Sequence, residues 1–459
     1  MEASRRIRVV IWCALATMLA FPGAVLAAED NLPTSAYFTL ENGLQVLLQE
    51  KHDLPLTGLA LAIDLGTKDE TEQTSGYAHL IEHMLLFGAG SELDSETRLA
   101  ELRRHGIAHN AHTDHDLMTF EISCPSADSI WALERLRQTV FFSRMDPLHL
   151  ESEKRIIREE ILQLRDNPSY LGRLLVMERL FAGHPYGQPV YGDGSSIQAA
   201  TVERLQAFCD RRLVPGRCTL SVIGAFSLTE MEKEVRRSWG ELEKKHSLEA
   251  TVLLAEDLKK SSEQQIELDI QESHLFFGWR APDFNHEHRL ALNLLVHILG
   301  RGLNPLLNQA LRGGRQLAQQ FDISYLPLRS GGMILLHLTL REKDIRSAKN
   351  EVTRFLRQLG SFNFSREDFR PQNRMYVLDF LRGAKNQMAY GTENFREAVL
   401  NMSVASARFL LLNRNPLNGA YLENVEKVSS SDLRRVARKY LSGKKWAALV
   451  IKPLAGKKK

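Results

Sequence analysis

The sequence predicts an α+β fold built from two similar domains, each a sheet covered by helices. The segment Thr201–Val222 is patterned as an amphipathic helix followed by a short apolar strand, and Ser430–Ile451 repeats that pattern at the same offsets. The apolar helix segment Leu80–Leu85 resembles Leu294–Leu299, and each is followed by a glycine. Chance similarity between apolar helices is the alternative, but two matches in the same order favour an internal duplication.

The first 27 residues have the pattern of a secretory signal peptide. Three arginines among the first eight residues precede the uncharged apolar run Val9–Phe21, and Val25–Ala27 offers small residues for cleavage. A permanent membrane anchor would need about 20 apolar residues, which this run lacks. We therefore expect an exported protein, periplasmic or secreted.

Composition and charge divide the rest of the chain into three parts. We expect an N-terminal domain over residues 32–242, a charged and weakly patterned linker over 243–263, and a C-terminal domain of the same fold over 264–459. With 459 residues and 44% hydrophobic content, a large core is available. The net charge of +3 gives no reason to expect a nucleic acid partner, and no segment after the signal peptide is apolar enough to span a membrane.

Cysteine use does not indicate a disulfide framework. The mature chain keeps Cys124, Cys209 and Cys218, an odd number. Cys209 and Cys218 are able to pair in an oxidising compartment, but three partly buried thiols are the simpler interpretation.

The chemistry of the chain is concentrated in His79-Leu80-Ile81-Glu82-His83, inside an apolar helical run. On a helix, positions 79, 82 and 83 share one face, so two imidazoles one turn apart are able to hold one metal ion. Glu82 then points toward the open coordination position. The pattern is the inverted form of a common zinc-peptidase helix motif.

A zinc ion needs a third protein ligand, and the helical pattern Glu151–Asp166 offers several glutamates. Glu160 is flanked at helical spacing by Ile156, Ile157 and Leu164, which predicts that it lies on the buried face. Glu159 falls on the opposite, wet face. Glu153 precedes Glu160 by seven residues and shares its face, which suits a hydrogen bond to one of the ligands.

These residues resemble the pitrilysin and insulinase (M16) family of zinc metallopeptidases, in the branch of the mitochondrial processing peptidase subunits. The resemblance covers nearly the whole mature chain. It rests on Gly76–Met84, on a glutamate pair ending about 77 residues after the second histidine, which falls on Glu153 and Glu160, and on Gly183–Gly187. It implies one Zn²⁺ per chain, held by His79, His83 and Glu160.

The resemblance also implies an architecture and a mode of substrate binding. The family fold has two similar domains, each with a mostly antiparallel sheet, which together form half of a clamshell, and only the first carries metal. Asn110 and Ala111 match the edge strand to which the substrate backbone adds as an extra strand. The expected function is zinc-dependent endopeptidase activity on peptides or unfolded segments in an enclosed chamber, with Glu82 as the general base.

One position departs from the family pattern. Active members place an arginine and, seven residues later, a tyrosine opposite the zinc; Arg312 matches the arginine, but the tyrosine position is Gln319. The expected assembly is a dimer, and a heterodimer with a metal-free chain that carries both residues is one form of it. The alternative functions are a weakly active subunit or a peptide-binding module that needs a partner for catalysis.

The other histidines near the motif are not expected to bind metal. His105, His109, His112 and His115 cluster near the motif, but on a strand position 112 faces away from 109 and 115, so they make a poor metal cage. His297, which matches His83 in the second copy, is interpreted as a packed helix residue.

Overall fold

The structure is a computed structural model. It describes residues 34–87, 95–246, 258–300, 305–362, 364, 398–414, 424–425 and 427–454. The predicted signal peptide and most of the predicted linker lie outside these residues. No helix in the described ranges is both long and apolar enough to cross a membrane.

The N-terminal half contains a six-stranded sheet and the helices that cover it. Its elements are β1 (Ser35–Thr39), β2 (Gln45–Glu50), β3 (Leu56–Ile63), α1 (Tyr77–Leu86), α2 (Ser95–Arg104), β4 (Ala108–Thr113), β5 (Met118–Pro125), α3 (Ser129–Phe141), α4 (Pro147–Arg165), α5 (Pro168–Leu180), α6 (Ser195–Gln198), α7 (Val202–Cys209), β6 (Cys218–Gly224) and α8 (Leu228–Glu234).

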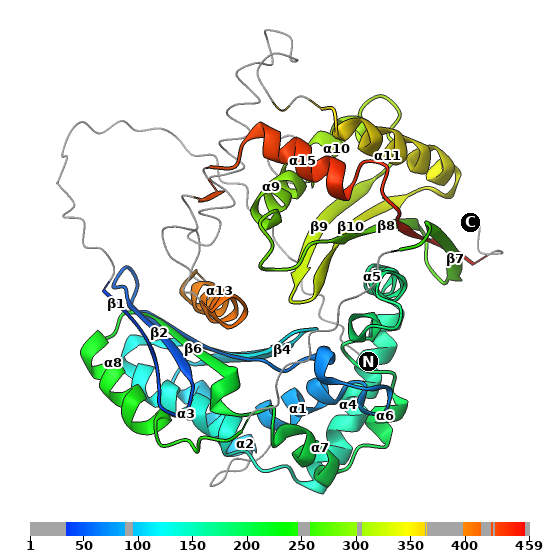
Figure 1. The fold of residues 1–459 in the computed structure, drawn as a ribbon. Helices are drawn as coiled ribbons and strands as arrows, with labels where there is room; N and C mark the ends of the chain where they lie inside the picture. Colours follow the sequence, from blue (N-terminus) through cyan, green and yellow to red (C-terminus); the bar gives the residue numbers. More distant parts are fainter. Residues whose placement is uncertain are drawn as a thin grey trace, which may run out of the picture.

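The C-terminal half repeats this plan with a five-stranded sheet (Figure 1). Its elements are β7 (Ser262–Leu268), β8 (Ser273–Ala281), α9 (Arg289–Gly300), α10 (Leu306–Arg312), β9 (Gln320–Leu328), β10 (Gly331–Leu340), α11 (Ile345–Leu359), α13 (Ala398–Asn413), α15 (Ser430–Tyr440) and β11 (Ala447–Pro453).

The strand order of the two sheets shows the internal duplication directly. The first sheet runs β1-β2-β6-β3-β5-β4 and the second β7-β11-β8-β10-β9, so each strand after β1 has a counterpart in the same place. The pairs β2–β6 and β7–β11 are parallel and the others antiparallel. Both repeats predicted from the sequence fall on matching elements, α7–β6 with α15–β11 and α1 with α9. The fold class predicted from the sequence is therefore correct.

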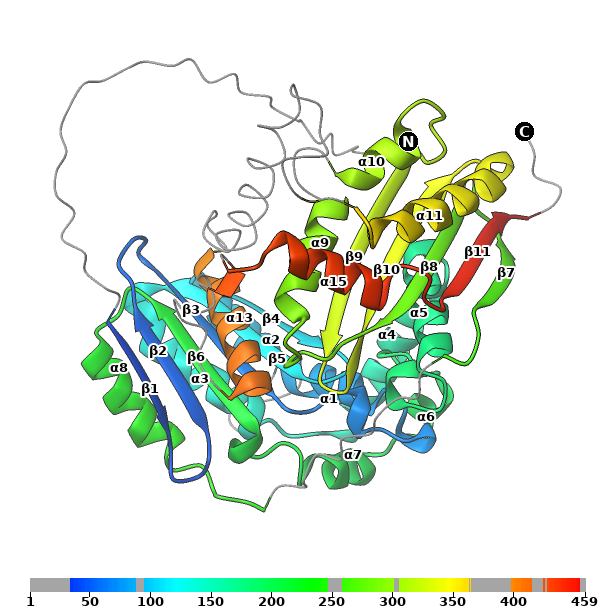
Figure 2. The same cartoon turned by 45° about the horizontal axis from the view of Figure 1, so that its top comes forward.

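The two halves exchange a helix. Helix α5 follows the N-terminal sheet in the chain but packs on β8 and β11 of the C-terminal sheet, where Val176 and Leu180 join one apolar cluster with Phe276 and Leu449. Helix α13 belongs to the C-terminal half but packs on β3 and β6 (Figures 1 and 2). This exchange covers the second face of each sheet, which explains why β3 and β8 are buried along almost their whole length.

Two glycines in equivalent strands permit this close packing. A Cβ at Gly58 of β3 would meet the carbonyl oxygen of Val399 at 2.7 Å, and one at Gly278 of β8 would meet Cγ1 of Val176 at 2.3 Å. A side chain at either position would push the exchanged helix off the sheet. The glycines are therefore part of what joins the halves into one body.

A buried polar network also joins the halves beside the end of β4. The backbone N–H of Arg329, between β9 and β10, donates to Asp116 Oδ2 at 2.7 Å, and the Tyr186 hydroxyl donates to Asp116 Oδ1 at 2.5 Å. The Arg329 guanidinium donates to Asp64 Oδ1 at 3.2 Å. The motif Gly183–Gly187 thus supplies, through Tyr186, an anchor that holds the second half against the strand edge of the first.

The cysteines of the described residues are all free thiols. Cys124, Cys209 and Cys218 are buried, and none is joined to another. The simpler of the two interpretations made from the sequence agrees with this arrangement.

Candidate metal centre

Helix α1 carries the histidine motif and is fixed at both ends. It starts after Gly76, whose left-handed backbone (φ 85°) suits glycine. The carboxylate of Glu70 accepts hydrogen bonds from the N–H groups of Gly76 at 2.9 Å and Ala78 at 2.8 Å, which caps the first turn. At the other end the buried Arg98 donates to the carbonyl of Leu86. All ten residues of α1 are buried, so the helix is a rigid platform.

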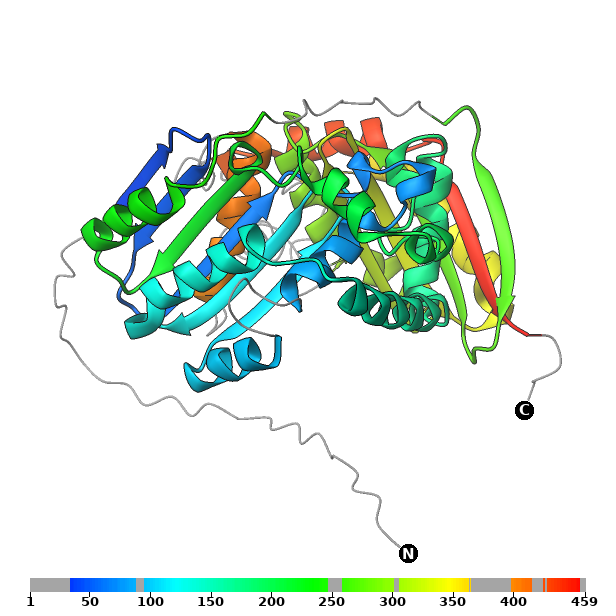
Figure 3. The same ribbon diagram turned by 90° about the horizontal axis from the view of Figure 1, so that it is seen from below.

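His79, His83 and Glu160 lie together where α1 meets α4. One ligand atom from each falls within 4.8 Å of the others. Glu160 Oε2 is 3.8 Å from His79 Nε2 and 3.6 Å from His83 Nε2. Helix α1 lies with α3 and α7 on the side of the N-terminal sheet that faces away from α13 (Figure 1), and Figure 3 shows this helical layer from below.

The distances between the three side chains suit coordination of a single metal ion better than direct hydrogen bonds. Their separations are too long for hydrogen bonds, but donors around one tetrahedral zinc stand about 3.3 Å apart when each bond is about 2.0 Å. Among the described residues, Glu160 Oε2 is buried without a hydrogen-bond partner. Burial and the neighbouring His83 lower the pKa of His79 to about 3, so its imidazole is neutral and able to donate a lone pair.

Glu153 orients one of the histidines. The Nδ1–H of His83 donates to Glu153 Oε2 at 2.9 Å, and the Glu153 side chain is only 4% exposed. Burial alone would lower the pKa of His83, but the Glu153 hydrogen bond and the charges of Glu160, Glu153 and Glu82 raise it overall. The contact leaves Nε2 of His83 facing Glu160, as a metal ligand requires.

The structure corrects the predicted burial of Glu160. Ile156, taken as a neighbour on the buried face, is 43% exposed, and the side chain of Glu160 itself is 36% exposed. Glu159 is exposed and lies 3.9 Å from Arg158. Glu160 therefore lies at the rim between core and surface, where a ligand that also faces substrate has to be. Periodicity alone predicted a deeper position than the structure gives.

Glu82 lies beside the three side chains but is not one of the clustered group. It is 7% exposed, and one oxygen accepts a hydrogen bond of 2.5 Å from the hydroxyl of Thr113. Burial raises the pKa of Glu82, while the Thr113 hydrogen bond and the charge of His83 act against that rise. A buried carboxylate with a raised pKa is a better proton acceptor than an exposed one.

Strand β4 forms the edge of the sheet next to α1. It pairs with β5 and is the last strand in the order, so its other side is open within the described residues. Asn110 is exposed and Ala111 is buried, as alternation along a strand requires. Thr113 of the same strand holds Glu82. The edge predicted to receive the substrate backbone is therefore a free sheet edge joined to the candidate base.

Arg312 and Gln319 are not part of this cluster. Both are exposed; Arg312 ends α10, and the backbone N–H of Gln319 donates to the carbonyl of Thr339 at 2.9 Å. Figures 1 and 2 both show α10 beyond the C-terminal sheet, away from α1. Within one chain, these two residues do not face the metal centre.

The neighbouring histidines have other partners. His105 contacts Asp128 at 2.7 Å and stacks on Trp131, His112 lies 3.2 Å from Glu121, and His115 contacts the hydroxyl of Thr67 at 2.9 Å. Across the described ranges, His79, His83 and Glu160 form the one cluster with the spacing of a metal site. His297 is half-buried on α9.

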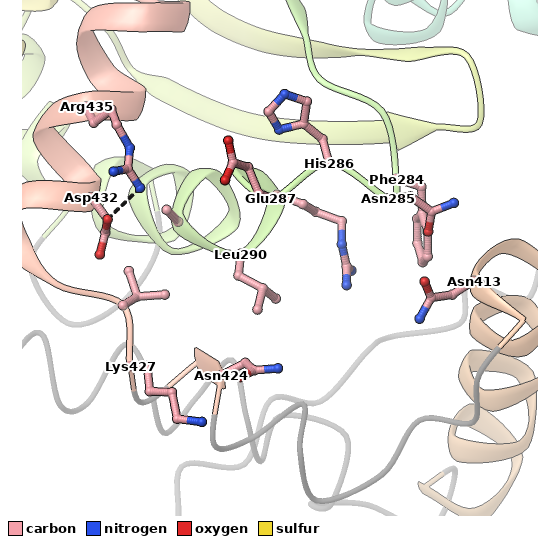
Figure 4. A pocket seen from close by; sticks show the side chains of 13 residues that line it. Phe284, Asn285, His286, Glu287, Leu290, Asn413, Asn424, Lys427, Asp432 and Arg435 are labelled. Atoms are coloured by element: carbon pink, nitrogen blue, oxygen red, sulfur yellow. Dashed lines mark hydrogen bonds and ion pairs between the residues drawn. The ribbon is translucent and has the colours of Figure 1, made fainter.

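A hollow of about 400 Å³ lies elsewhere, between the N-terminal ends of α9 and α15 and the end of α13 (Figure 4). Charges of both signs line it, and Arg435 points to Asp432, with which it pairs at 2.6 Å. Arg289, Lys427 and Arg435 stand against Glu287 and Asp432 in this lining, and residues of the metal centre are not part of it.

Glu70 is a structural contributor that the motif analysis missed. Its signal in the sequence is a carboxylate six residues before Gly76, the residue that precedes the helix, a spacing too long for an ordinary N-cap.

Replacing Glu70 with glutamine should lower the free energy of unfolding by about 1–2 kcal/mol, because an amide is unable to accept from both N–H groups with both atoms. Burial raises the pKa of Glu70 to about 8, so urea unfolding of the zinc-free protein at a pH above this value, where the carboxylate is ionised, measures this effect. The matched control is Glu72→Gln in the neighbouring exposed turn, for which a change within about 0.5 kcal/mol is expected. Equal stability of the two variants would show that Glu70 does not stabilise the start of α1.

Comparison with known proteins places this geometry in a family. The family model for insulinase (peptidase family M16) matches residues 45–194, and the model for the peptidase M16 inactive domain matches residues 199–372. The chain belongs to peptidase family M16. The first match contains every residue of the candidate metal centre. The second runs from the last elements of the N-terminal half to residue 372 and contains helix α9, which lacks the metal-binding set.

Relatives of the M16 chain are similar along almost its full length. An uncharacterized zinc protease of Mycobacterium leprae is 24% identical over 95% of this chain and 96% of the relative. The zinc protease PqqE of Helicobacter pylori is 23% identical over 94% and 96%. The beta subunit of the mitochondrial-processing peptidase of Lentinula edodes is 22% identical over 92% and 91%.

Solved structures show the same M16 fold. A protease from Helicobacter pylori superimposes with a TM-score of 0.81 at 21% identity, covering 92% of this chain and 100% of that one. A peptidase M16 inactive domain from Pseudomonas fluorescens gives a TM-score of 0.77 at 20% identity, covering 93% and 100%. These likenesses establish the architecture of two similar domains.

Proposed function

We propose that this chain is a zinc-dependent endopeptidase that cleaves peptides or unfolded protein segments. The observation that carries the proposal is the convergence of His79, His83 and Glu160 beside the buried Glu82, next to a free strand edge. A zinc ion bound by the three side chains would acidify a water and polarise the scissile carbonyl. The names of the M16 relatives, several of them zinc proteases, support the choice of metal.

Other residues of the chain provide proton transfer and substrate binding. Glu82 accepts the proton of the attacking water and later delivers it to the leaving amine, while Thr113 holds its carboxylate in place. The substrate backbone pairs with β4 near Asn110 and Ala111 as an added strand. Since backbone hydrogen bonds then supply much of the affinity, unfolded peptides should be better substrates than folded proteins. The signal-peptide pattern of residues 1–27 supports an exported site of action.

A second candidate follows from Gln319 and from the position of α10. If Arg312 does not reach the metal centre of its own chain, a second chain is needed to enclose the substrate. We propose a dimer that closes as a clamshell over the metal centre; the partner is either another copy or a metal-free M16 chain with the arginine and tyrosine. In the heterodimer, the isolated chain is a weakly active subunit.

Turnover of a quenched unfolded peptide by the isolated chain and by the natively purified complex separates these arrangements. For a homodimer, Arg312→Ala should cut turnover sharply and Gln319→Tyr should raise it or leave it intact. For a heterodimer, the isolated chain should be nearly inactive, the partner should restore turnover, and Arg312→Ala should matter little. We expect the heterodimer result. Full activity of the isolated chain with strong dependence on Arg312 contradicts it, and no cleavage in either preparation refutes the peptidase assignment.

A further inference from the structure

Tyr191 lies directly against the metal centre. Its ring contacts the ring of His79 edge to face, with centroids 4.3 Å apart and planes at 62°. On another side it meets Tyr170 of α5, with centroids 5.8 Å apart and planes at 82°. Tyr191 therefore occupies a wall of the site formed by neither α1 nor β4, and the motif analysis did not single it out.

The backbone around Tyr191 is pressed onto the start of α1. A Cβ at Gly192 would lie 2.7 Å from the carbonyl oxygen of Ser75, and one at Gly76 would lie 2.8 Å from Cα of Gly192. Both glycines also have positive φ, at 78° and 85°. This contact fixes the Tyr191 loop to the same turn that positions His79, so the ring is held in place without any bond from its hydroxyl.

The hydroxyl of Tyr191 has no hydrogen-bond partner among the described residues, although the side chain is half-buried. An ordinary phenol has a pKa of about 10, so the hydroxyl keeps its proton at neutral pH. The ring contact with His79 places Tyr191 beside the ligand set, where substrate would react.

We infer that the Tyr191 hydroxyl donates a hydrogen bond to the carbonyl oxygen of the scissile peptide as negative charge develops there. The water oxygen bonds to the carbonyl carbon, the carbonyl π pair moves to its oxygen, and the water proton goes to Glu82. The pair on the oxygen then re-forms the carbonyl, the C–N bond breaks, and the C–N pair takes the proton from Glu82 as the amine leaves. Tyr191 keeps its proton throughout. The role rests on the proposed function, and it is additional to any arginine and tyrosine that a partner chain brings to the metal centre.

Tyr191→Phe tests the role because it keeps the ring against His79 and removes only the hydroxyl. The variant should still bind about one zinc per chain. In the natively purified complex, kcat should fall about 10²-fold with KM within about twofold, since a donor to the developing oxyanion acts in the transition state. The affinity for a phosphinic peptide, a tetrahedral anionic mimic, should fall by a similar factor. Tyr37→Phe, on the exposed strand β1, is the control and should match the wild type.

Three results would overturn the inference. Wild-type kcat and phosphinic-peptide affinity in zinc-loaded Tyr191→Phe would show that the Tyr191 hydroxyl donates no hydrogen bond to the developing oxyanion. Loss of zinc from Tyr191→Phe would show that the residue only holds His79. Equal loss of affinity for the phosphinic peptide and for an unmodified peptide of the same sequence would assign it to ground-state binding. Absence of turnover in the wild type refutes the proposed function instead, and the phosphinic-peptide comparison then still decides the role of Tyr191.

Discussion

Zinc-loaded Glu82→Gln protein is expected to show no measurable peptide cleavage. Glu82 is buried, is held by Thr113 and lies outside the group of clustered ligand atoms, so its loss removes a proton acceptor and leaves the metal set intact. A general base contributes about 10²–10⁴-fold in rate, and glutamine has no basic oxygen to replace it.

Zinc content and peptide turnover of the same Glu82→Gln preparation measure the two effects separately. About one zinc per chain with turnover lowered at least 10²-fold is the expected pair of values. The variant Thr113→Val keeps the Glu82 carboxylate but removes the hydrogen bond that it accepts from Thr113. Its turnover is expected to lie between those of the wild type and Glu82→Gln. Near-normal turnover in the zinc-loaded glutamine variant would rule out Glu82 as the base.

Replacing Glu160 with glutamine is expected to remove most of the bound zinc. Its Oε2 lies within 3.8 Å of both imidazole nitrogens, and a neutral amide is a much weaker zinc ligand than a carboxylate. Metal analysis after dialysis against a weak chelator measures the loss. Glu159→Gln, one residue earlier on the exposed face of the same helix, is the matched control and should keep its zinc. The opposite outcome, with zinc retained by Glu160→Gln and lost from Glu159→Gln, would reassign the third ligand.

The metal-binding residues could be predicted from the sequence because their arrangement depends on local helix geometry. The spacing of His79, Glu82 and His83 fixes their shared face on any helix, and the seven-residue step from Glu153 to Glu160 does the same on α4. The degree of burial of the Glu160 side chain could not be predicted. Periodicity shows which residues share a helix face, but it does not show how far the neighbouring helix extends over that face. The exposure of Ile156 is the result of that difference.

The exchange of α5 and α13 was beyond sequence reasoning for a related reason. An apolar stripe predicts that a helix packs on something, but two sheets of the same design offer equivalent surfaces. Gly58 and Gly278 become informative only when their strands are known to be counterparts. Glu70 and Tyr191 were missed because each acts on α1 across a loop, at separations that no helical or strand period describes.

We propose that one zinc ion at His79, His83 and Glu160 gives this chain its peptidase activity. Titrating the metal-free protein with zinc, in its natively purified assembly, while following cleavage of a quenched unfolded peptide tests this directly. Cleavage is expected to rise from the background rate and to reach a plateau at about one zinc per chain, with no rise when the chain carries Glu82→Gln. Zinc bound in that ratio without any cleavage, or cleavage that continues in the metal-free protein, would contradict it.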